Sequence, residues 1–181
     1  TYDADVFCGY TGRCVAKFRK SVIPKKIQQL AYNNLLSAAV QTDNRGISGG
    51  GAVNGSTRKY RELSDGRLSK TSEAQVSVNS GIIGYFDSTP RFPYCRQTSF
   101  NMHHFEKFKK AYPIIKTVDK IYSQLMPDHY KLQREVAERT PSEFVIPDTA
   151  FTTVTVNKDW QTAVHQDKGD FKEGFGNLVA L

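Results

Sequence analysis

The pattern of apolar and polar positions in the first eighty residues predicts one strand, one helix and a long polar region. Partial alternation over residues 15–22 predicts a strand, and Pro24 then opens a predicted helix over residues 24–40. One stripe of that helix is apolar and consists of Ile27, Leu30, Ala31, Leu35 and Ala38. Residues 43–55 are rich in glycine, and residues 58–80 are polar and charged, which predicts a loop or an excursion from the core. Because the glycine-rich part has no Gly-Lys-Ser/Thr ending, a flexible loop is favoured over a phosphate-binding loop.

The remaining residues predict a buried strand, three helices and then further strands. Residues 81–86 are an apolar run between Gly and Asp, which is typical of a short buried strand. Helical segments are predicted over residues 101–111, from Pro113 to about residue 125, and over residues 129–139, and the segment that starts at Pro113 has an apolar face. Strands are predicted over residues 151–156, 162–167 and 174–181, with a turn at 157–159. Helices followed by strands, without internal repeats, predict an α+β fold with helices packed on one β-structure.

Composition and charge narrow the class of protein. The 181 residues are 39% hydrophobic and 24% charged, as in one globular domain. No apolar run approaches the ~20 residues that span a bilayer, so we expect no membrane partner. The net charge of +7 favours a polyanionic partner such as nucleic acid. Three cysteines without a secretory signal indicate free thiols and an intracellular protein.

His165 and Asp167 form the most informative short pattern in the chain. They lie two positions apart in the segment TAVHQD, and on a strand such residues project from the same face. An imidazole nitrogen and a carboxylate oxygen on one face supply two of the three ligands of a facial triad for non-haem Fe(II). The same pair also suits a hydrogen-bonded couple at an exposed strand edge, so the pattern alone leaves both interpretations open.

A close resemblance to the TET/JBP family of dioxygenases lies in residues 151–176, FTTVTVNKDWQTAVHQDKGDFKEGFG. Enzymes of this family oxidise 5-methylcytosine or thymine in nucleic acid. Three upstream blocks resemble the family in the same order: LLSAAV (35–40), SGIIGYFD (80–87) and CRQTSF (95–100). The Asn-Arg-Gly at 44–46 resembles the smaller viral and protist branch of the family.

The resemblance implies a double-stranded β-helix (jelly-roll) core flanked by N-terminal helices. It implies Fe(II) held by His165 and Asp167, with 2-oxoglutarate as co-substrate. Asp170 occupies the position that faces the flipped base in related enzymes, and Asn44 lies in a loop from which they reach that base. The family's second metal-binding His and its 2-oxoglutarate-binding Arg come later in the family pattern. We therefore expect Thr1–Leu181 to be a single dioxygenase catalytic domain, truncated at its C-terminal end and inactive by itself.

The predicted function is oxidation of the 5-methyl group of 5-methylcytosine in DNA to 5-hydroxymethylcytosine or beyond. One alternative is a thymine hydroxylase on DNA that yields 5-hydroxymethyluracil. Others are a non-catalytic DNA-binding module with a vestigial site and an oxygenase that acts on free bases or a small metabolite. We expect the protein in the nucleus or inside a virus-infected host cell, as a monomer or as a domain completed by further chain.

Several other side chains have two interpretations from sequence. Trp160 suits a stacking platform or pocket wall, but also a core or hairpin-edge position. Arg96 suits a contact with DNA phosphate or a brace of the core. His103, His104 and His129 are expected to be solvated residues on helices. Two groups of lysines suit solvated faces or DNA contacts: Lys17, Lys20, Lys25 and Lys26, and Lys107, Lys109 and Lys110.

Overall fold

The computed structural model describes residues 3–43, 45–49, 58–62, 68–72, 77–162, 165 and 171–181. Three candidate site residues, Asn44, Asp167 and Asp170, therefore lie outside the described part of the chain. The strands are β1 (Ala4–Phe7), β2 (Cys14–Phe18), β3 (Val40–Thr42), β4 (Arg58–Glu62), β5 (Leu68–Ser72), β6 (Val78–Phe86), β7 (Arg96–Gln97) and β8 (Thr153–Lys158). The α-helices are α1 (Lys25–Leu35), α2 (Ser99–Lys110), α3 (Tyr112–Leu125) and α4 (Pro127–Arg139), and the 3-10 helices are η1 (Leu36–Ala38), η2 (Gly46–Gly49) and η3 (Ser142–Phe144).

β6 is the central strand of the main sheet, and its three partners all run antiparallel to it. β3 pairs with its first residues, β8 pairs with Asn79 to Gly84, and β7 pairs with Tyr85 and Phe86. Ile83 is completely buried and Tyr85 is nearly so. The apolar run at 81–86 thus predicted a buried strand correctly, and the strand begins three residues earlier, at Val78.

Two glycines of β6 allow neighbouring chain segments to lie directly against it. A Cβ atom at Gly81 would collide with the carbonyl oxygen of Ala38, and one at Gly84 would collide with the carbonyl oxygen of Thr152. Gly84 also has a φ of +95°, a backbone conformation that residues with a side chain rarely adopt. The glycines therefore fix how closely η1 and the start of β8 approach the central strand.

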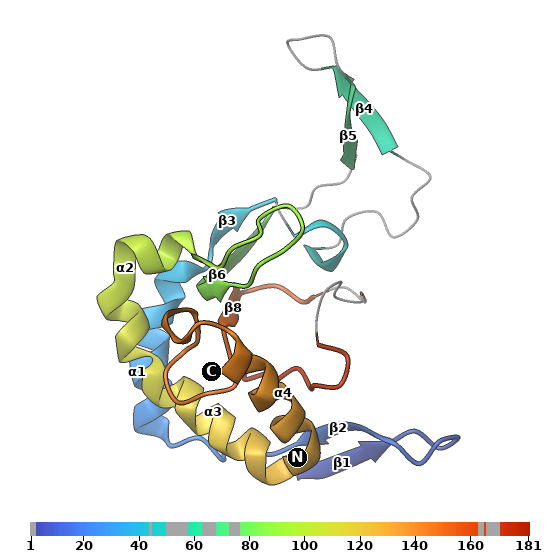
Figure 1. Ribbon diagram of the computed structural model, residues 1–181, viewed down its shortest axis with the longest axis vertical. Helices are drawn as coiled ribbons and strands as arrows, with labels where there is room; N and C mark the ends of the chain where they lie inside the picture. The colour runs from blue at the N-terminus through green and yellow to red at the C-terminus, as the bar shows by residue number, and fades with distance from the viewer. Residues whose placement is uncertain are drawn as a thin grey trace.

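The four α-helices gather beside this sheet, as Figure 1 shows. Apolar side chains from α1 to α3 meet those of β6 in one hydrophobic core, whose buried members are Ala31, Leu35, Ala38, Ile83, Tyr85, Phe108, Ala111, Ile114, Ile115 and Ile146. All four predicted helices are present, although α1 ends at Leu35 and continues as η1 rather than reaching residue 40. No helix in the described ranges is long and apolar enough to cross a membrane.

The CRQTSF block joins the start of α2 to the central strand. The Thr98 hydroxyl accepts a hydrogen bond from the Asn101 backbone N–H at 3.4 Å and so caps the helix. Asn101 in turn accepts the backbone N–H of Gly84 at 2.9 Å through its side-chain oxygen. Thr98 and Asn101 are both buried. This polar pair fixes the position of α2 relative to β6, because a buried polar group that lost its partner would be costly.

The structure bears out the mixed α+β class and corrects several finer expectations. No closed barrel is present among the described residues, so the jelly-roll core stays a prediction. Only α1 precedes the sheet along the chain, because α2 to α4 lie between β7 and β8 rather than at the N-terminus. The region 58–80 is not simply a loop: it contains the antiparallel pair β4–β5 and the start of β6.

Two expectations near the C-terminal end also differ from the structure. β8 is displaced by two residues from the predicted strand at 151–156, and the chain turns at Asp159, whose φ is +57°. Residues 174–181 form no strand, and the backbone N–H of Phe175 donates a hydrogen bond to the Tyr122 side chain on α3 instead of to a neighbouring strand. Of the strand expected at 162–167, only Thr162 and His165 are described, and neither lies in a strand.

Tyr112 should make the stability of the fold depend on alkaline pH. Burial, together with the neighbouring Tyr85 hydroxyl, raises its pKa from 10.0 to about 12. Between these values the folded state keeps a proton that the unfolded state has lost, so the free energy of unfolding should fall as pH rises from about 10 through 12. Urea unfolding of the Tyr112→Phe variant should show a shallower fall than wild type, whereas Tyr10→Phe, at a 98% exposed residue, should not. An unchanged slope in Tyr112→Phe would contradict this origin.

Candidate metal centre

β8 pairs with the central strand β6 and ends seven residues before His165. Six residue pairs join β8 to β6, from Gly84↔Thr153 to Asn79↔Lys158. Just beyond the last pair, the indole N–H of Trp160 donates a hydrogen bond to the carbonyl oxygen of Asn79 at 2.8 Å. Trp160 is half-buried, so the structure favours the hairpin-edge interpretation of this residue. The register of the ladder and this bond fix the chain five residues before His165.

His165 is exposed, and it is the one predicted iron ligand among the described residues. Asp167, Asp170 and Asn44 lie outside them, so the structure tests neither the iron ligands nor the base-binding residues as a group. Within the described ranges, no three His, Cys, Asp or Glu residues are close enough together to hold a metal ion. The assignment of His165 and Asp167 to the metal thus stays a prediction.

The donor chemistry of this pair fits Fe(II). Imidazole nitrogen and carboxylate oxygen are the ligands of the 2-His-1-carboxylate sites that leave coordination positions open for a co-substrate. The sequence therefore predicts His165 and Asp167 as the residues of this chain that would hold the iron.

The other three histidines divide into two kinds. His103 and His104 are exposed on α2, as expected from the sequence. His129 on α4 is different, because its Nδ1 lies 2.7 Å from the carbonyl oxygen of Glu173 and its ring packs edge-on against Phe175 at 4.9 Å. The expectation of a solvated His129 was wrong. Local sequence carries no signal for this contact, since its two partners are separated by 44 positions.

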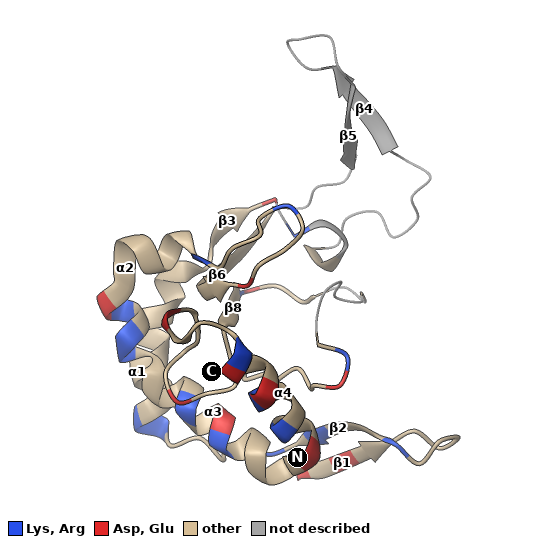
Figure 2. Ribbon diagram, viewed as in Figure 1, with Lys and Arg blue, Asp and Glu red and all other residues tan. Residues whose placement is uncertain are grey.

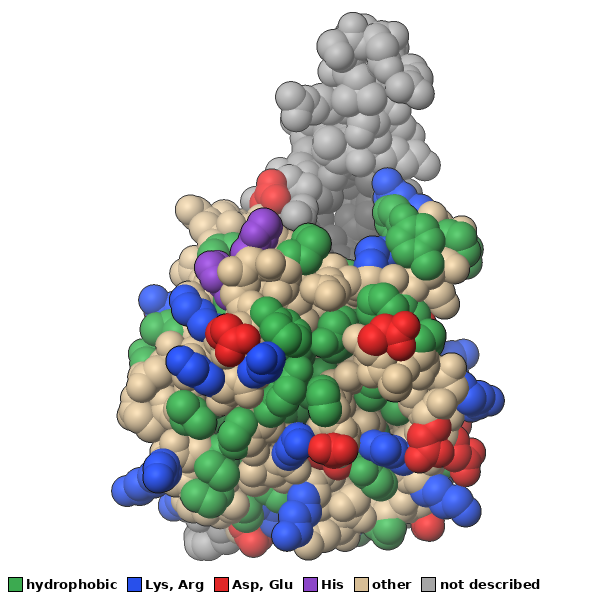
Figure 3. Space-filling model, turned by 60° about the vertical axis from the view of Figure 1, so that its left-hand side comes forward, with side chains coloured by type: hydrophobic (Ala, Val, Ile, Leu, Met, Phe, Trp, Pro, Cys, Tyr) green, Lys and Arg blue, Asp and Glu red, His purple; other side chains and the backbone are tan. Residues whose placement is uncertain are grey.

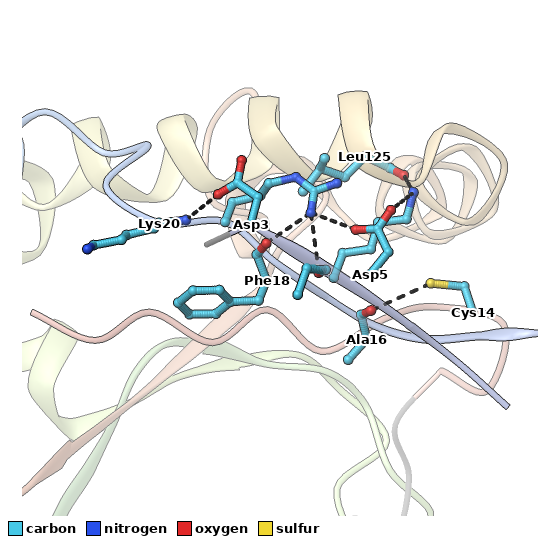
Figure 4. Close-up of polar contacts among 10 residues, drawn as sticks. Asp3, Asp5, Cys14, Ala16, Phe18, Lys20 and Leu125 are labelled. Atoms are coloured by element: carbon cyan, nitrogen blue, oxygen red, sulfur yellow. Dashed lines mark hydrogen bonds and ion pairs between the residues drawn. The ribbon is translucent and has the colours of Figure 1, made fainter. Parts of the chain in front are cut away.

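Several of the lysines singled out in the sequence are engaged within the protein. Figure 4 shows the β1–β2 hairpin beside the end of α3, where Lys17 donates to the Leu125 carbonyl oxygen at 2.9 Å. On α2, Lys107 donates to the Ser37 hydroxyl at 3.0 Å and Lys109 pairs with Glu106 at 2.9 Å. Each of these three lysines therefore contacts another group of the protein.

Four lysines are exposed and are the better candidates for contacts with a polyanion: Lys20, Lys25, Lys26 and Lys110. Basic and acidic residues are spread over several helices rather than segregated along one of them (Figure 2). On the face in Figure 3, basic side chains alternate with acidic and hydrophobic ones. This face therefore presents no single basic patch.

Arg96 of the CRQTSF block braces the core. Its guanidinium carbon lies 4.0 Å from the centre of the Phe92 ring and 4.9 Å from that of Phe86, which is the geometry of a cation–π contact. Its Nη1 atom is buried and has no hydrogen-bond partner among the described residues. The structure therefore favours the structural interpretation of Arg96 over a contact with DNA phosphate.

Comparison with known proteins identifies the family. Residues 81–181 match the Tet/JBP family, described as the oxygenase domain of the 2OGFeDO superfamily. Among curated relatives, the chain is 42% identical over 105 residues to the bifunctional helicase and thymine dioxygenase JBP2 of Leishmania braziliensis, which is 57% of this chain and 9% of that protein. It is 42% identical over 108 residues to the thymine dioxygenase JBP1 of Trypanosoma brucei brucei, covering 59% of this chain and 12% of that protein.

The matched stretch therefore spans about a tenth of the length of these relatives. No solved structure matches the chain at a significant level. The family match covers more than half of the chain and contains β6 from Gly81 onward, β8 and the His165–Asp167 pair. The chain belongs to the Tet/JBP oxygenase domains of the 2OGFeDO superfamily, whose metal is Fe(II) and whose co-substrate is 2-oxoglutarate.

Proposed function

We propose that the protein is an Fe(II)- and 2-oxoglutarate-dependent dioxygenase that oxidises the 5-methyl group of thymine in DNA to give 5-hydroxymethyluracil. The observation that carries this proposal is the family match over residues 81–181, which includes His165, Asp167 and Asp170. The relatives named above are thymine dioxygenases, which supports thymine as the base. The net charge of +7 supports a polyanionic substrate such as DNA.

In this proposal the chain supplies two metal ligands and one residue that holds the base. His165 and Asp167 bind Fe(II) from one side and leave the other side open. With both bound, Fe(II) and 2-oxoglutarate supply the oxidising chemistry: 2-oxoglutarate loses CO2 and becomes succinate, with one atom of O2 in succinate and the other in the hydroxymethyl product. A methyl group inside a stacked duplex is out of reach, so the target nucleotide must leave the stack at a cost of a few kcal/mol.

Asp170 is the residue that we assign to the flipped base. Its carboxylate accepts hydrogen bonds and so suits the N3–H group of thymine. Asn44 is a second candidate for a base contact from the loop after β3. 5-Methylcytosine, which the sequence analysis placed first, stays the second candidate substrate because a carboxylate also suits its N4 amino group.

The test uses two DNA duplexes that each contain one kind of methylated base. One has thymine and unmodified cytosine, and the other has uracil in place of thymine and 5-methylcytosine in place of cytosine. The full-length protein is supplied with Fe(II) and 2-oxoglutarate, and hydroxymethylated bases and succinate are measured by mass spectrometry. We expect 5-hydroxymethyluracil from the first duplex. Product from the second duplex alone would establish the second candidate, and no product from either would refute the proposal.

The variant Asp170→Ala should keep binding of metal and 2-oxoglutarate but lose most of the hydroxymethylated base. Glu135→Ala, which removes an exposed carboxylate on α4, is the matched control and should retain wild-type yield. Equal yields from Asp170→Ala and wild type would make Asp170 a turn residue without a role in base recognition.

The location of the protein is proposed on the same basis. Cys8, Cys14 and Cys95 are free thiols in the structure, which supports an intracellular protein. A DNA base as substrate supports the nucleus or the interior of a virus-infected host cell.

A further inference from the structure

A set of contacts fastens residues 173–175 to α3 and α4. The Nδ1 atom of His129 lies 2.7 Å from the Glu173 carbonyl oxygen, and because a carbonyl oxygen only accepts, Nδ1 is the donor. The backbone N–H of Phe175 donates to the Tyr122 hydroxyl at 3.1 Å. The Phe175 ring meets the His129 ring edge-on at 4.9 Å. We call the contacts of His129 and Tyr122 with residues 173–175 the clasp.

Tyr122 is the buried half of the clasp. It is only 2% exposed, and its ring stacks on Phe151 at 6.3 Å with an angle of 15° between the planes. Its hydroxyl accepts from Phe175 and donates to the Gln133 side-chain oxygen at 3.0 Å, so both functions of the hydroxyl are used. Burial raises the pKa of Tyr122, which keeps the hydroxyl protonated and able to donate near neutral pH.

The segment approaches α4 closely, and Gly174 permits this approach. A Cβ atom at Gly174 would lie 2.5 Å from the side-chain oxygen of Gln133 and 3.1 Å from the Phe171 ring. A side chain there would displace the same Gln133 oxygen that accepts the Tyr122 hydroxyl. Residues 173–175 are therefore fitted closely against α3 and α4 at the clasp. Figure 1 shows this C-terminal stretch returning to the helices.

The clasp lies just downstream of the candidate site residues in sequence. Glu173 follows Asp170 by three positions and Asp167 by six. On the other side, Trp160 bonds to Asn79 of β6 and precedes His165 by five positions. Both ends of the stretch that contains the site residues are thus tied to the helices and the sheet. Tying both ends of a stretch restricts the conformations open to every residue within it.

We propose that His129 and Tyr122 are positioning residues, which hold the downstream end of the stretch containing His165, Asp167 and Asp170 and so preorganise the iron ligands and the base-binding carboxylate. The proposal rests on the assignment of those three residues under the proposed function. Neither residue touches substrate or metal in this proposal.

The test compares four variants of the full-length protein. His129→Ala removes the donor, and His129→Asn restores an amide N–H near the place of Nδ1. Tyr122→Phe removes the hydroxyl but keeps the ring that stacks on Phe151. His103→Ala replaces an exposed histidine on α2 and is the matched control. Fe(II) affinity is titrated without oxygen in the presence of 2-oxoglutarate, and hydrogen–deuterium exchange is followed in peptides from residues 161–175 and from α2.

We expect His129→Ala and Tyr122→Phe to weaken Fe(II) binding about tenfold, as loss of outer-shell support does in other metal sites. Exchange should accelerate in residues 161–175 but not in α2, and His129→Asn should recover most of the Fe(II) affinity. Wild-type Fe(II) affinity in both His129→Ala and Tyr122→Phe would overturn the proposal. Faster exchange in α2 as well would also overturn it, because the two residues would then support the whole fold rather than the site.

These measurements separate the clasp from the proposed substrate. A wild-type protein that binds Fe(II) but leaves both DNA duplexes unmodified would refute the proposed function, while selective loss of Fe(II) binding in the clasp variants would still establish the clasp. In the converse outcome, wild-type protein oxidises thymine while the clasp variants keep wild-type Fe(II) affinity. That result would refute the positioning role of the clasp and support the proposed function.

Discussion

Alanine in place of His165 or Asp167 is expected to abolish Fe(II)-dependent oxidation of DNA bases while the protein stays folded. Each substitution removes one protein ligand of the iron, and a site with three protein ligands does not tolerate the loss of one. The fold should survive, because His165 is exposed and lies beyond the last paired residue of β8. Product formation by mass spectrometry and Fe(II) binding by anaerobic titration measure the effect, and far-UV circular dichroism checks the fold.

His103→Ala is the control for this pair, because it removes a histidine that is also exposed. It should retain both Fe(II) binding and activity. Full activity in His165→Ala or Asp167→Ala would end the assignment of these residues to the metal. Loss of circular dichroism together with activity would instead assign them a structural role.

The substitutions Gly81→Ala and Gly84→Ala are expected to destabilise the fold strongly, because each adds a methyl group to β6 where a neighbouring backbone leaves no room. At Gly81 the new Cβ meets the Ala38 carbonyl oxygen, and at Gly84 it meets the Thr152 carbonyl oxygen at a positive φ. Backbone atoms cannot move aside as the end of a flexible side chain can, so the spacing between β6 and the neighbouring segment must change. We expect a loss of about 3 kcal/mol or more in the free energy of unfolding, at the upper end of overpacking effects.

Urea unfolding measures this loss, and two glycines of the same chain serve as controls. A Cβ atom added at Gly9 or Gly176 would meet no atom within 4 Å, so Gly9→Ala and Gly176→Ala should stay within about 0.5 kcal/mol of wild type. Wild-type stability in Gly81→Ala or Gly84→Ala would mean that η1 and the start of β8 do not lie as close to β6 as described.

The sequence predicted those elements whose signal is local. The Pro113 helix and the GIIGYF strand have a strong apolar pattern of their own, and the structure contains both. The pair β4–β5 was missed, because its residues are mostly polar or charged and leave no apolar period in the sequence. The segment 174–181 was predicted to be a strand, but its hydrogen-bond partners include the side chain of Tyr122 on α3.

Some residues of the candidate site could be named from a local sequence motif, and others only from contacts between distant parts of the chain. His165 and Asp167 share a short motif within a longer family pattern, so they could be named from sequence. His129 could not, because only the packing of α4 against the C-terminal segment brings its ring to Glu173. Trp160 and Arg96 each had two interpretations until the structure supplied their partners, Asn79 for one and two phenylalanine rings for the other.

The position of β6 at the centre of the sheet also constrains the order in which the chain folds. Gly84 pairs with Thr153, and the chain between these two residues contains α2, α3 and α4. Closing so long a loop carries an entropic cost before any strand contact repays it, whereas each helix forms from neighbouring residues. The helices between the two strands shorten that loop if they form first. We therefore infer that the β6–β8 ladder forms late, after the helical hairpin of α3 and α4.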